Sequence, residues 1–376
     1  MKWMEELRNL EIQEDPVDII KREALPVVLW GAGEFAGEIW RYLKNRDVEI
    51  SQVVVDDDYF TPGSHLGEYK VIPRSELMKQ QTMVNVVWAN SSYEKIPSLA
   101  CDCVIHKVYY IFSVNYGIHK QTPISYIEEH LEELDSSYAV LEDEISRKNF
   151  LAFIKTRVTG DNAFIWQEFM KEGNFFHNDV FCVDDREVLF DVGAYDGDTI
   201  RLFLKETGGK YRYIYAWEPD AQNFLKLENY IRGEDLKNIE TMAIGAWNSE
   251  GTIAFSAVNE QISSVSVGSS QETAGCTSIP VKRIDEMAAC GAPITMLKIN
   301  YHEGVYEALE GAAGILKGQR PKLAITVGFN CANICRIPQL IKEINPRYRL
   351  YLRFNRAMVS ACTLYGICGA YGTVSK

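Results

Sequence analysis

The stretch VLFDVGAYDGDT, residues 188–199, decides the fold of the C-terminal half of this chain. Its apolar start, Val188 to Phe190, ends in an acid. A loop with small residues at 193, 194 and 197 follows, and then an amphipathic segment from Thr199 to Lys205. This order is typical of a buried strand, a tight turn and a helix. Because small residues let the backbone approach a ligand closely, we predict a ligand-binding turn here.

Acids in the same turn indicate which ligands it favours. Asp191, Asp196 and Asp198 would repel a pyrophosphate, although a helix N-terminus is otherwise suited to one. A ligand with a positive charge and with amine or hydroxyl donors fits better, and S-adenosylmethionine is such a ligand. Glu218 ends the next apolar run, Tyr213 to Trp217. A carboxylate at that position can accept two hydrogen bonds from a ribose diol.

Five blocks of sequence, in order, resemble the FkbM-type S-adenosylmethionine-dependent methyltransferases. They are FDVGAYDGDT, YAWEPD, NIETMAIGAWNSEGTIAF, IPVKRIDEM and LKINYHEGVYEALEGA, and the resemblance runs from roughly Glu187 to the C-terminus. It implies S-adenosylmethionine as cofactor and a hydroxyl of a sugar or secondary metabolite as methyl acceptor. It also implies a cofactor site formed by Asp191, Gly193, Ala194, Asp196 and Glu218, with Ala243 beside the adenine.

Strands and helices are predicted to alternate from residue 187 onward. The predicted strands are 188–191, 212–217, about 239–244, 294–300 and 322–329, followed by a closing pair, Tyr348–Phe354 and Cys362–Cys368. This pattern fits the class I methyltransferase sheet of seven strands, which is Rossmann-like. Ligands of such sheets bind at the carboxyl ends of the strands. The strand ends to consider are therefore Asp191, Glu218, Ala243, Asn300 and Phe329.

On the substrate side, the chain departs from the family pattern. The family motif KIDxEGAE reads KINYHEGV here, so a gap-free alignment places Asn300 at the Asp and His302 at the next acid. Glu303 and Gly304 restore the EG pair only through a slip of one residue. Further positions that the family fills with polar or titratable residues are Phe329, Asn333, Phe354 and Ala361, next to a retained Arg353.

Two hypotheses follow from these replacements. In the first, the acceptor differs and His302 is the general base, with Asn300 as a hydrogen-bonding partner. In the second, catalysis has lapsed while the fold and cofactor site are retained. His302 could equally be a solvent-facing residue at a helix start. No metal site is predicted, because an asparagine does not replace an aspartate as a ligand for a divalent ion.

Two more features lie near this region. Ser263 and Ser264, between the third and fourth predicted strands, are expected in a polar surface loop. Lys298 lies inside a strand, where a lysine usually extends to the surface or pairs with an acid.

Residues 25–115 are predicted to form a small Rossmann-like domain. Pro26–Trp30 reads as a strand, Gly31, Gly33 and Ala36 as a glycine turn, and Ile50–Val55 as a strand that ends in three aspartates. Three interpretations are open: an NAD site, a sugar-nucleotide site, or a structural domain that keeps the turn for packing. The last two are favoured over NAD, because Ala36 replaces the third glycine. An NAD-linked oxidoreductase is the least favoured function, since no Tyr-x-x-x-Lys pair follows.

The remaining segments complete the predicted α/β organisation. Residues 1–24 read as a helical segment, residues 116–185 as a helical connector, and residues 186–376 as the methyltransferase domain.

Composition narrows the function classes. A net charge of −13 argues against a nucleic-acid partner. No secretory signal and no apolar run long enough to span a membrane are present. The nine cysteines are scattered and include no CxxC, which favours reduced thiols over a metal site. We therefore expect a cytoplasmic protein with a small-molecule or sugar substrate and leave open whether it forms a homo-oligomer.

Overall fold

The computed structural model describes residues 2–8, 15–90, 95–99, 102–110, 122–159, 163–166, 168, 173–259, 262–266, 276–288, 291–301, 303–356 and 358–369. The chain divides into two compact units. The first comprises Met1–Gln121 and Lys155–Trp166, and the second comprises Thr122–Ile154 and Gln167–Lys376. The segment predicted as a helical connector is thus divided between the two units.

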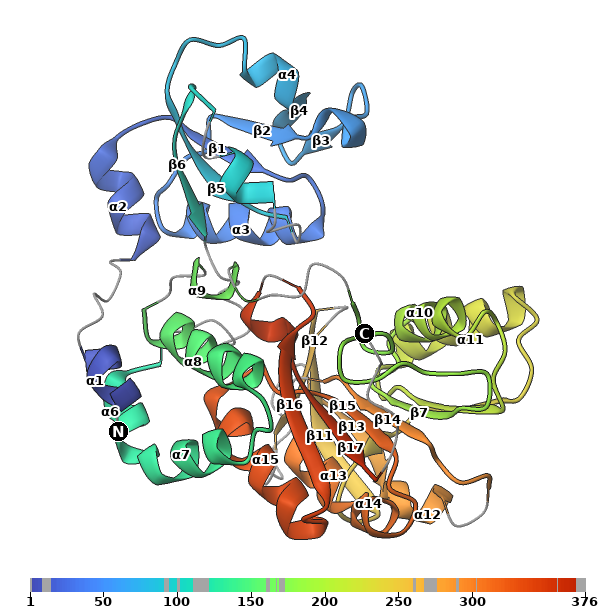
Figure 1. The fold of residues 1–376 in the computed structure, drawn as a ribbon. Helices are drawn as coiled ribbons and strands as arrows, with labels where there is room; N and C mark the ends of the chain where they lie inside the picture. The colour runs from blue at the N-terminus through green and yellow to red at the C-terminus, as the bar shows by residue number, and fades with distance from the viewer. Residues whose placement is uncertain are drawn as a thin grey trace. The chain divides into compact units, whose positions relative to one another are not determined.

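A six-stranded sheet with strand order β3-β4-β2-β1-β5-β6 forms the centre of the first unit. The five parallel strands are β1 (Val27–Trp30), β2 (Gln52–Val55), β4 (Tyr69–Pro73), β5 (Val84–Trp88) and β6 (Ile105–Tyr110), and β3 (His65–Leu66) pairs antiparallel with β4. Apolar residues of α2 (Pro16–Glu23) and α3 (Glu34–Asn45) pack into one core with these strands. This parallel sheet is Rossmann-like, as predicted (Figure 1).

Short elements complete the first unit. They are α1 (Lys2–Arg8), η1 (Asp57–Tyr59), α4 (Arg74–Leu77), α5 (Ile96–Leu99) and α9 (Ala163–Trp166), together with the end of α8 (Glu144–Thr159).

The predicted glycine turn after β1 serves close packing. Gly31 has a φ of +135°, and a Cβ added there would lie 2.2 Å from the carbonyl oxygen of Ala89. Only glycine therefore lets the ends of β1 and β5 approach this closely. Asp56, the acid after β2, accepts a hydrogen bond from Lys95 Nζ at 2.6 Å. These contacts favour a structural role for the turn, and nothing in them requires a dinucleotide.

The second unit contains the predicted seven-stranded sheet, with strand order β16-β17-β15-β14-β7-β8-β9. Its strands are β7 (Val188–Val192), β8 (Tyr213–Trp217), β9 (Ile239–Met242), β14 (Met296–Ile299), β15 (Lys322–Thr326), β16 (Tyr348–Phe354) and β17 (Cys362–Cys368). All neighbours are parallel except β17, which is antiparallel to both β15 and β16. The fold class is therefore confirmed.

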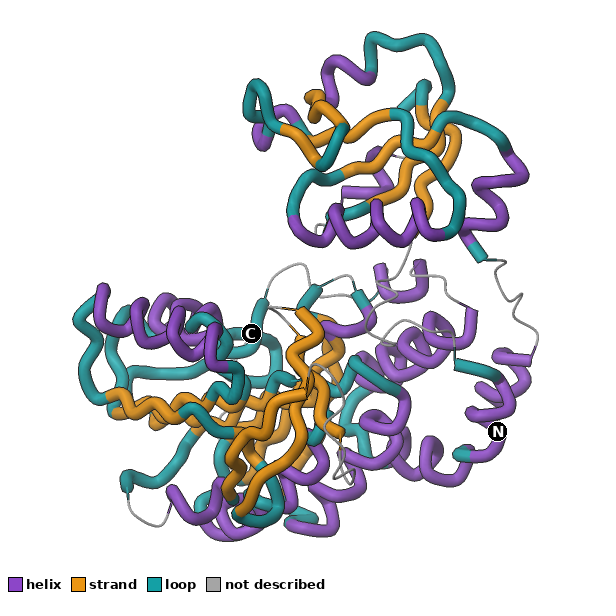
Figure 2. The backbone as a smooth tube through the Cα atoms, turned by 180° about the vertical axis from the view of Figure 1, so that it is seen from behind, coloured by secondary structure: helices purple, strands orange, loops and turns teal. Residues whose placement is uncertain are grey.

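Helices cover both faces of this sheet (Figures 1 and 2). On one face lie α10 (Asp198–Glu206) and α11 (Ala221–Gly233), whose apolar residues join the core of β7 and β8. On the other lie α13 (Val305–Glu310), α14 (Ala313–Gly318) and α15 (Cys331–Ile344). Ser137 of α7 (Leu131–Ala139), which follows α6 (Ile124–Glu129), donates a hydrogen bond to the Cys335 carbonyl and so fixes α7 on α15.

A separate four-stranded sheet was not predicted. Its order is β10-β13-β11-β12, with β10 (Gly245–Ala246), β11 (Gly251–Asn259), β12 (Ile262–Ser266) and β13 (Cys276–Lys282). Ser263 and Ser264 lie in β12, which pairs antiparallel with β11, so the expectation of a polar loop there was wrong. The helix α12 (Ile284–Ala288) follows β13 in the chain, and η4 (Val359–Ala361) precedes β17.

Arg353, near the end of β16, ties distant segments of the second unit together. Its side chain is 2% exposed. The guanidinium donates to Asp143 at 2.6 Å and to Asp179 at 2.7 Å, and it also donates to the Ser146 hydroxyl. Asp143 precedes α8, so this arginine, which the family pattern also contains, holds part of the predicted connector against the sheet.

Candidate functional site

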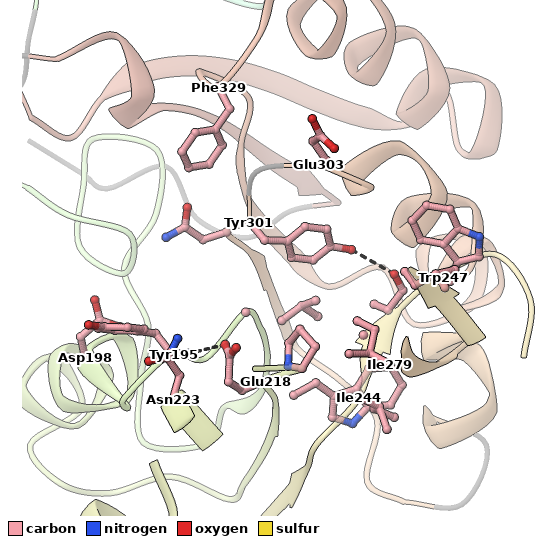
Figure 3. Close-up of a pocket in the computed structure, with 18 of the residues that line it drawn as sticks. Tyr195, Asp198, Glu218, Asn223, Ile244, Trp247, Ile279, Tyr301, Glu303 and Phe329 are labelled. Atoms are coloured by element: carbon pink, nitrogen blue, oxygen red, sulfur yellow. Dashed lines mark hydrogen bonds between the residues drawn. The ribbon is translucent and has the colours of Figure 1, made fainter. Parts of the chain in front are cut away.

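A cavity of about 290 Å³ opens at the carboxyl edge of the seven-stranded sheet (Figure 3). Small-molecule sites in proteins begin at roughly this size, about 300 Å³. The cavity is lined by Val192, Gly193, Tyr195, Asp198, Trp217, Glu218, Pro219, Asn223, Ile244, Gly245, Ala246, Trp247, Ile253, Ile279, Asn300, Tyr301, Glu303, Phe329 and Arg356.

The strand order explains why a cavity forms at this position. From β7 the chain continues to β8 and β9 on one side, and it then returns to β14 on the other side of β7. The loops after β7 and β14 therefore leave in opposite directions, which opens a crevice between them. Gly193 follows β7, Glu218 follows β8 and Asn300 follows β14, so residues far apart in the sequence meet at this switch point.

Glu218 presents a buried carboxylate to the cavity. It is 5% exposed. Its Oε2 accepts the backbone N–H of Tyr195 at 2.8 Å, and its Oε1 accepts that of Asp220 at 2.9 Å. Burial raises the pKa of Glu218 to about 7, although the two backbone N–H groups oppose this rise. Each carboxylate oxygen keeps an acceptor position for a ligand hydroxyl.

The turn after β7 has the backbone geometry that its small residues allow. Gly193 has a φ of +74°, and a Cβ there would lie 2.5 Å from the carbonyl oxygen of Asn300. Tyr195 adopts a φ of +50°, which is uncommon for a residue with a side chain. Such conformations concentrate at functional sites, where surrounding contacts hold them. Here the hydrogen bond from the Tyr195 backbone to Glu218 provides one such contact.

Beneath this turn, Asp191 forms a buried ion pair with Lys298. Both side chains are fully buried, and Lys298 Nζ lies 2.7 Å from Asp191 Oδ1 and 2.9 Å from the Gly193 carbonyl oxygen. Asp191 Oδ2 has no hydrogen-bond partner in the described part of the chain. Burial raises the pKa of Asp191 to about 6, against the attraction of Lys298. The lysine therefore pairs with an acid, as expected, and Asp191 supports the turn without lining the cavity.

Three other residues predicted to bind the cofactor lie outside the cavity lining. Ala194 is fully buried in the core, and Asp196 accepts a hydrogen bond from Arg201 at 3.1 Å. Ala243 is exposed. Their neighbours Asp198 and Ile244 line the cavity instead. Of the six residues predicted to bind the cofactor, the structure brings Gly193 and Glu218 together in the lining.

The family model of the methyltransferase FkbM domain matches residues 191–351. These residues form an FkbM methyltransferase domain. A solved structure described as methyltransferase FkbM from Methylobacillus flagellatus KT is similar over 97% of this chain and 97% of that chain, with a TM-score of 0.66 and 18% identity. That likeness shows a shared fold across both units. No curated protein matches the chain.

Other solved structures are similar over a smaller part of the chain. An rRNA methylase from Streptococcus thermophilus covers 50% of this chain and 88% of its own, with 16% identity and a TM-score of 0.31. The Aeropyrum pernix fibrillarin structure with bound S-adenosyl-L-methionine covers 53% of this chain and 70% of its own, with 9% identity and a TM-score of 0.33.

Of the two predicted catalytic residues of the FkbM domain, the structure describes Asn300 but not His302. Asn300 follows β14 and lines the cavity. His302 lies outside the described residues, so its role stays a prediction. Glu303, which the gap-free alignment did not select, lines the cavity. Gly304 after it has a φ of +85° and precedes α13, and a Cβ there would lie 2.6 Å from the Trp247 ring. This geometry fits the EG pair at residues 303 and 304.

An apolar wall, whose residues were not predicted from the sequence, closes one side of the cavity. Trp247, Ile253 and Ile279 come from the four-stranded sheet and the turn beside it, and they pack in one cluster. Tyr301 faces this wall, and its hydroxyl donates to the carbonyl oxygens of Ala246 at 3.1 Å and Gly304 at 3.2 Å (Figure 3). Burial raises the pKa of Tyr301 well above its usual value, so the phenol is a structural donor.

Within the described ranges, no helix combines the length and apolar character needed to cross a bilayer. The same residues contain no group of three or more His, Cys, Asp or Glu that could hold a metal ion.

Proposed function

We propose that the chain is an S-adenosylmethionine-dependent methyltransferase that transfers a methyl group to a hydroxyl oxygen of a sugar or secondary metabolite. One observation carries the proposal: the buried Glu218 carboxylate and the Gly193 turn meet in one cavity at the switch point of a methyltransferase-fold sheet. The match of residues 191–351 to the FkbM domain supports the same conclusion.

The residues of the cavity fit this cofactor. Glu218 offers two carboxylate oxygens to a ribose diol, and Ile244 and Pro219 offer apolar surface to an adenine. Asp198 lies in the lining and is exposed, so a sulfonium or amino group would meet a negative charge there. When bound, the cofactor supplies an activated methyl group on sulfur. The chain must then hold the acceptor oxygen in line with that methyl group.

Glu303 is the described carboxylate on the acceptor side. In Figure 3 it lies near Phe329, at the opposite end of the cavity from Tyr195 and Glu218. We infer that Glu303 accepts the hydroxyl proton as the acceptor oxygen forms its bond to carbon and the carbon–sulfur bond breaks. Asn300 would hydrogen-bond the acceptor. His302 remains the other candidate for the proton, on sequence grounds.

Calorimetric titration of the full chain with S-adenosylhomocysteine tests cofactor binding. We expect binding that weakens at least tenfold in Glu218→Ala, while Glu240→Ala, a substitution of an acid outside the cavity, leaves it unchanged. No heat at millimolar ligand, or equal affinity in Glu218→Ala, would rule out the proposed site.

Turnover separates this proposal from a protein that has lost catalysis and kept the cofactor site. The neutral Asn300 and Phe329 in the cavity are the observation that favours such a loss. We expect methyl transfer to at least one member of a panel of hydroxylated sugars and aromatic metabolites. Glu303→Gln should lower kcat roughly a hundredfold without changing S-adenosylhomocysteine affinity. Binding without turnover on the whole panel would favour the lapsed enzyme.

A further inference from the structure

The charged residues that line the cavity of the FkbM domain are acids, with one exception. Among the described residues that line it, Asp198, Glu218 and Glu303 are acids and Arg356 is the only base. A cationic methyl donor accounts for acids near the Gly193 turn. An arginine in the same cavity pairs instead with an anion, and the two candidates are the carboxylate of the donor and a group on the acceptor.

The strand order separates Arg356 from the donor end. Glu218 follows β8, whereas Arg356 follows β16, which lies on the other side of β7 and β14. Between them along the sheet edge come Asn300 after β14 and Phe329 after β15. Since neighbouring strands are about 4.8 Å apart, Arg356 is anchored several strand spacings from the ribose-binding position. This is the end of the cavity that an acceptor would occupy.

Arg356 is available for a ligand. Its side chain is exposed, and no carboxylate of the described residues lies within ion-pair distance of it. Arg353, in the preceding strand, has the opposite environment, because it is buried and bound to Asp143 and Asp179. A guanidinium presents a planar fork of N–H donors that matches a carboxylate or phosphate in a bidentate pair.

We propose that Arg356 binds an anionic group of the methyl acceptor, so that the acceptor is a hydroxyl compound that also carries a carboxylate or a phosphate. The inference rests on the proposed function and specifies its substrate class. The acceptor hydroxyl lies toward Asn300 and Glu303, its ring or chain contacts Phe329, and its charge is paired with Arg356. Glu303 receives the hydroxyl proton, and the anionic group takes no part in bond making or breaking.

Matched ligands on the full chain test this proposal. The protein is first saturated with S-adenosylhomocysteine and then titrated with two series: glucose, glucuronate and glucose 6-phosphate, and catechol and 3,4-dihydroxybenzoate. We expect an anionic member to bind at least tenfold more tightly than its neutral partner. The preference should disappear in Arg356→Gln. It should persist in Arg347→Gln, which removes the same charge from an exposed residue at the start of β16, at the opposite edge of the sheet.

The arms of the experiment also separate the sources of the anion. Preference for glucuronate or dihydroxybenzoate assigns a carboxylate, and preference for glucose 6-phosphate assigns a phosphate. Equal binding of neutral and anionic members, or no binding of any anion, would overturn the inference. A tenfold loss of S-adenosylhomocysteine affinity in Arg356→Gln would also overturn it, because Arg356 would then hold the carboxylate of the donor. Absence of S-adenosylhomocysteine binding by the unsubstituted chain would instead remove the proposed function.

Discussion

The pH dependence of cofactor binding should follow the ionisation of Glu218. Burial raises the pKa of Glu218 to about 7, and its two oxygens already accept the backbone N–H groups of Tyr195 and Asp220. In the carboxylate form, both oxygens can also accept a hydroxyl of a ribose diol. A proton on either oxygen removes one of these acceptor positions. Lowering the pH should therefore weaken the binding of S-adenosylhomocysteine.

The size of this effect follows from the pKa. With a pKa of about 7, only about 3% of Glu218 is ionised at pH 5.5, whereas nearly all of it is ionised at pH 8.5. If binding requires the carboxylate, the Kd rises roughly thirtyfold between these pH values, which corresponds to about 2 kcal/mol.

Calorimetry at pH 8.5, 7 and 5.5 measures this effect in the unsubstituted chain and in Glu218→Gln. Glutamine has nearly the shape of glutamate but does not titrate, so binding to the variant should be weak and almost independent of pH. Asp191, whose pKa burial raises to about 6, also titrates in this range, and the variant separates its effect from that of Glu218. A flat affinity in the unsubstituted chain, or the same slope in both proteins, would refute the assignment of the ribose to Glu218.

Three further outcomes are expected from substitutions in the second unit. The pKa of Glu218 rises on folding from 4.5 to about 7. The contribution of this residue to the free energy of unfolding therefore falls by roughly 3 kcal/mol as the pH rises through that window. In urea unfolding, Glu218→Gln should thus gain stability relative to the unsubstituted chain between pH 5 and pH 8. Lys298→Met should cost about 3–5 kcal/mol, because it leaves Asp191 buried without its partner, and adding Asp191→Asn should recover part of this loss; an equally unstable double variant would contradict the ion-pair explanation. Gly193→Ala should cost at least about 2 kcal/mol in thermal unfolding, whereas Gly208→Ala, at a φ of +63° in open space, should cost about 1 kcal/mol; equal losses would show that the contact with Asn300 is not decisive.

Most of the large sheet could be predicted because its central strands, β7, β14 and β15, are buried on both faces. Residues 188–190 and 323–325 are apolar runs, and such runs stand out without reference to tertiary contacts. The four-stranded sheet gave no such signal. Its β10 has two residues and its β12 is rich in serine, so neither shows an apolar alternation. Their pairing with β11 and β13 depends on contacts distant in sequence.

The loops that line the cavity were predicted, but some of the lining residues lie one or two positions from those that the sequence selected. Asp198 and Ile244 line the cavity, where Asp196 and Ala243 were predicted to bind the cofactor. Gly197, with a φ of +89°, turns the chain between the two aspartates. At the end of a strand, a shift of one residue moves a side chain to the opposite face. The spacing of a motif therefore locates the loop, but it does not determine which side chain of the loop faces the cavity.

The structure of the loop after β14 bears on how residues 300–304 align with the family motif. A gap-free alignment placed His302 at the family acid and made the acceptor side look neutral. The positive φ of Gly304 and its close approach to Trp247 require a glycine at the start of α13. That requirement favours the EG pair at 303–304 and implies one additional residue between β14 and the pair. In this register Glu303 corresponds to the family acid, and Asn300 in place of Asp is the departure in this motif that lines the cavity. The case for lost catalysis then rests on Asn300 and Phe329, the neutral residues of the cavity lining at positions that the family pattern fills with titratable residues.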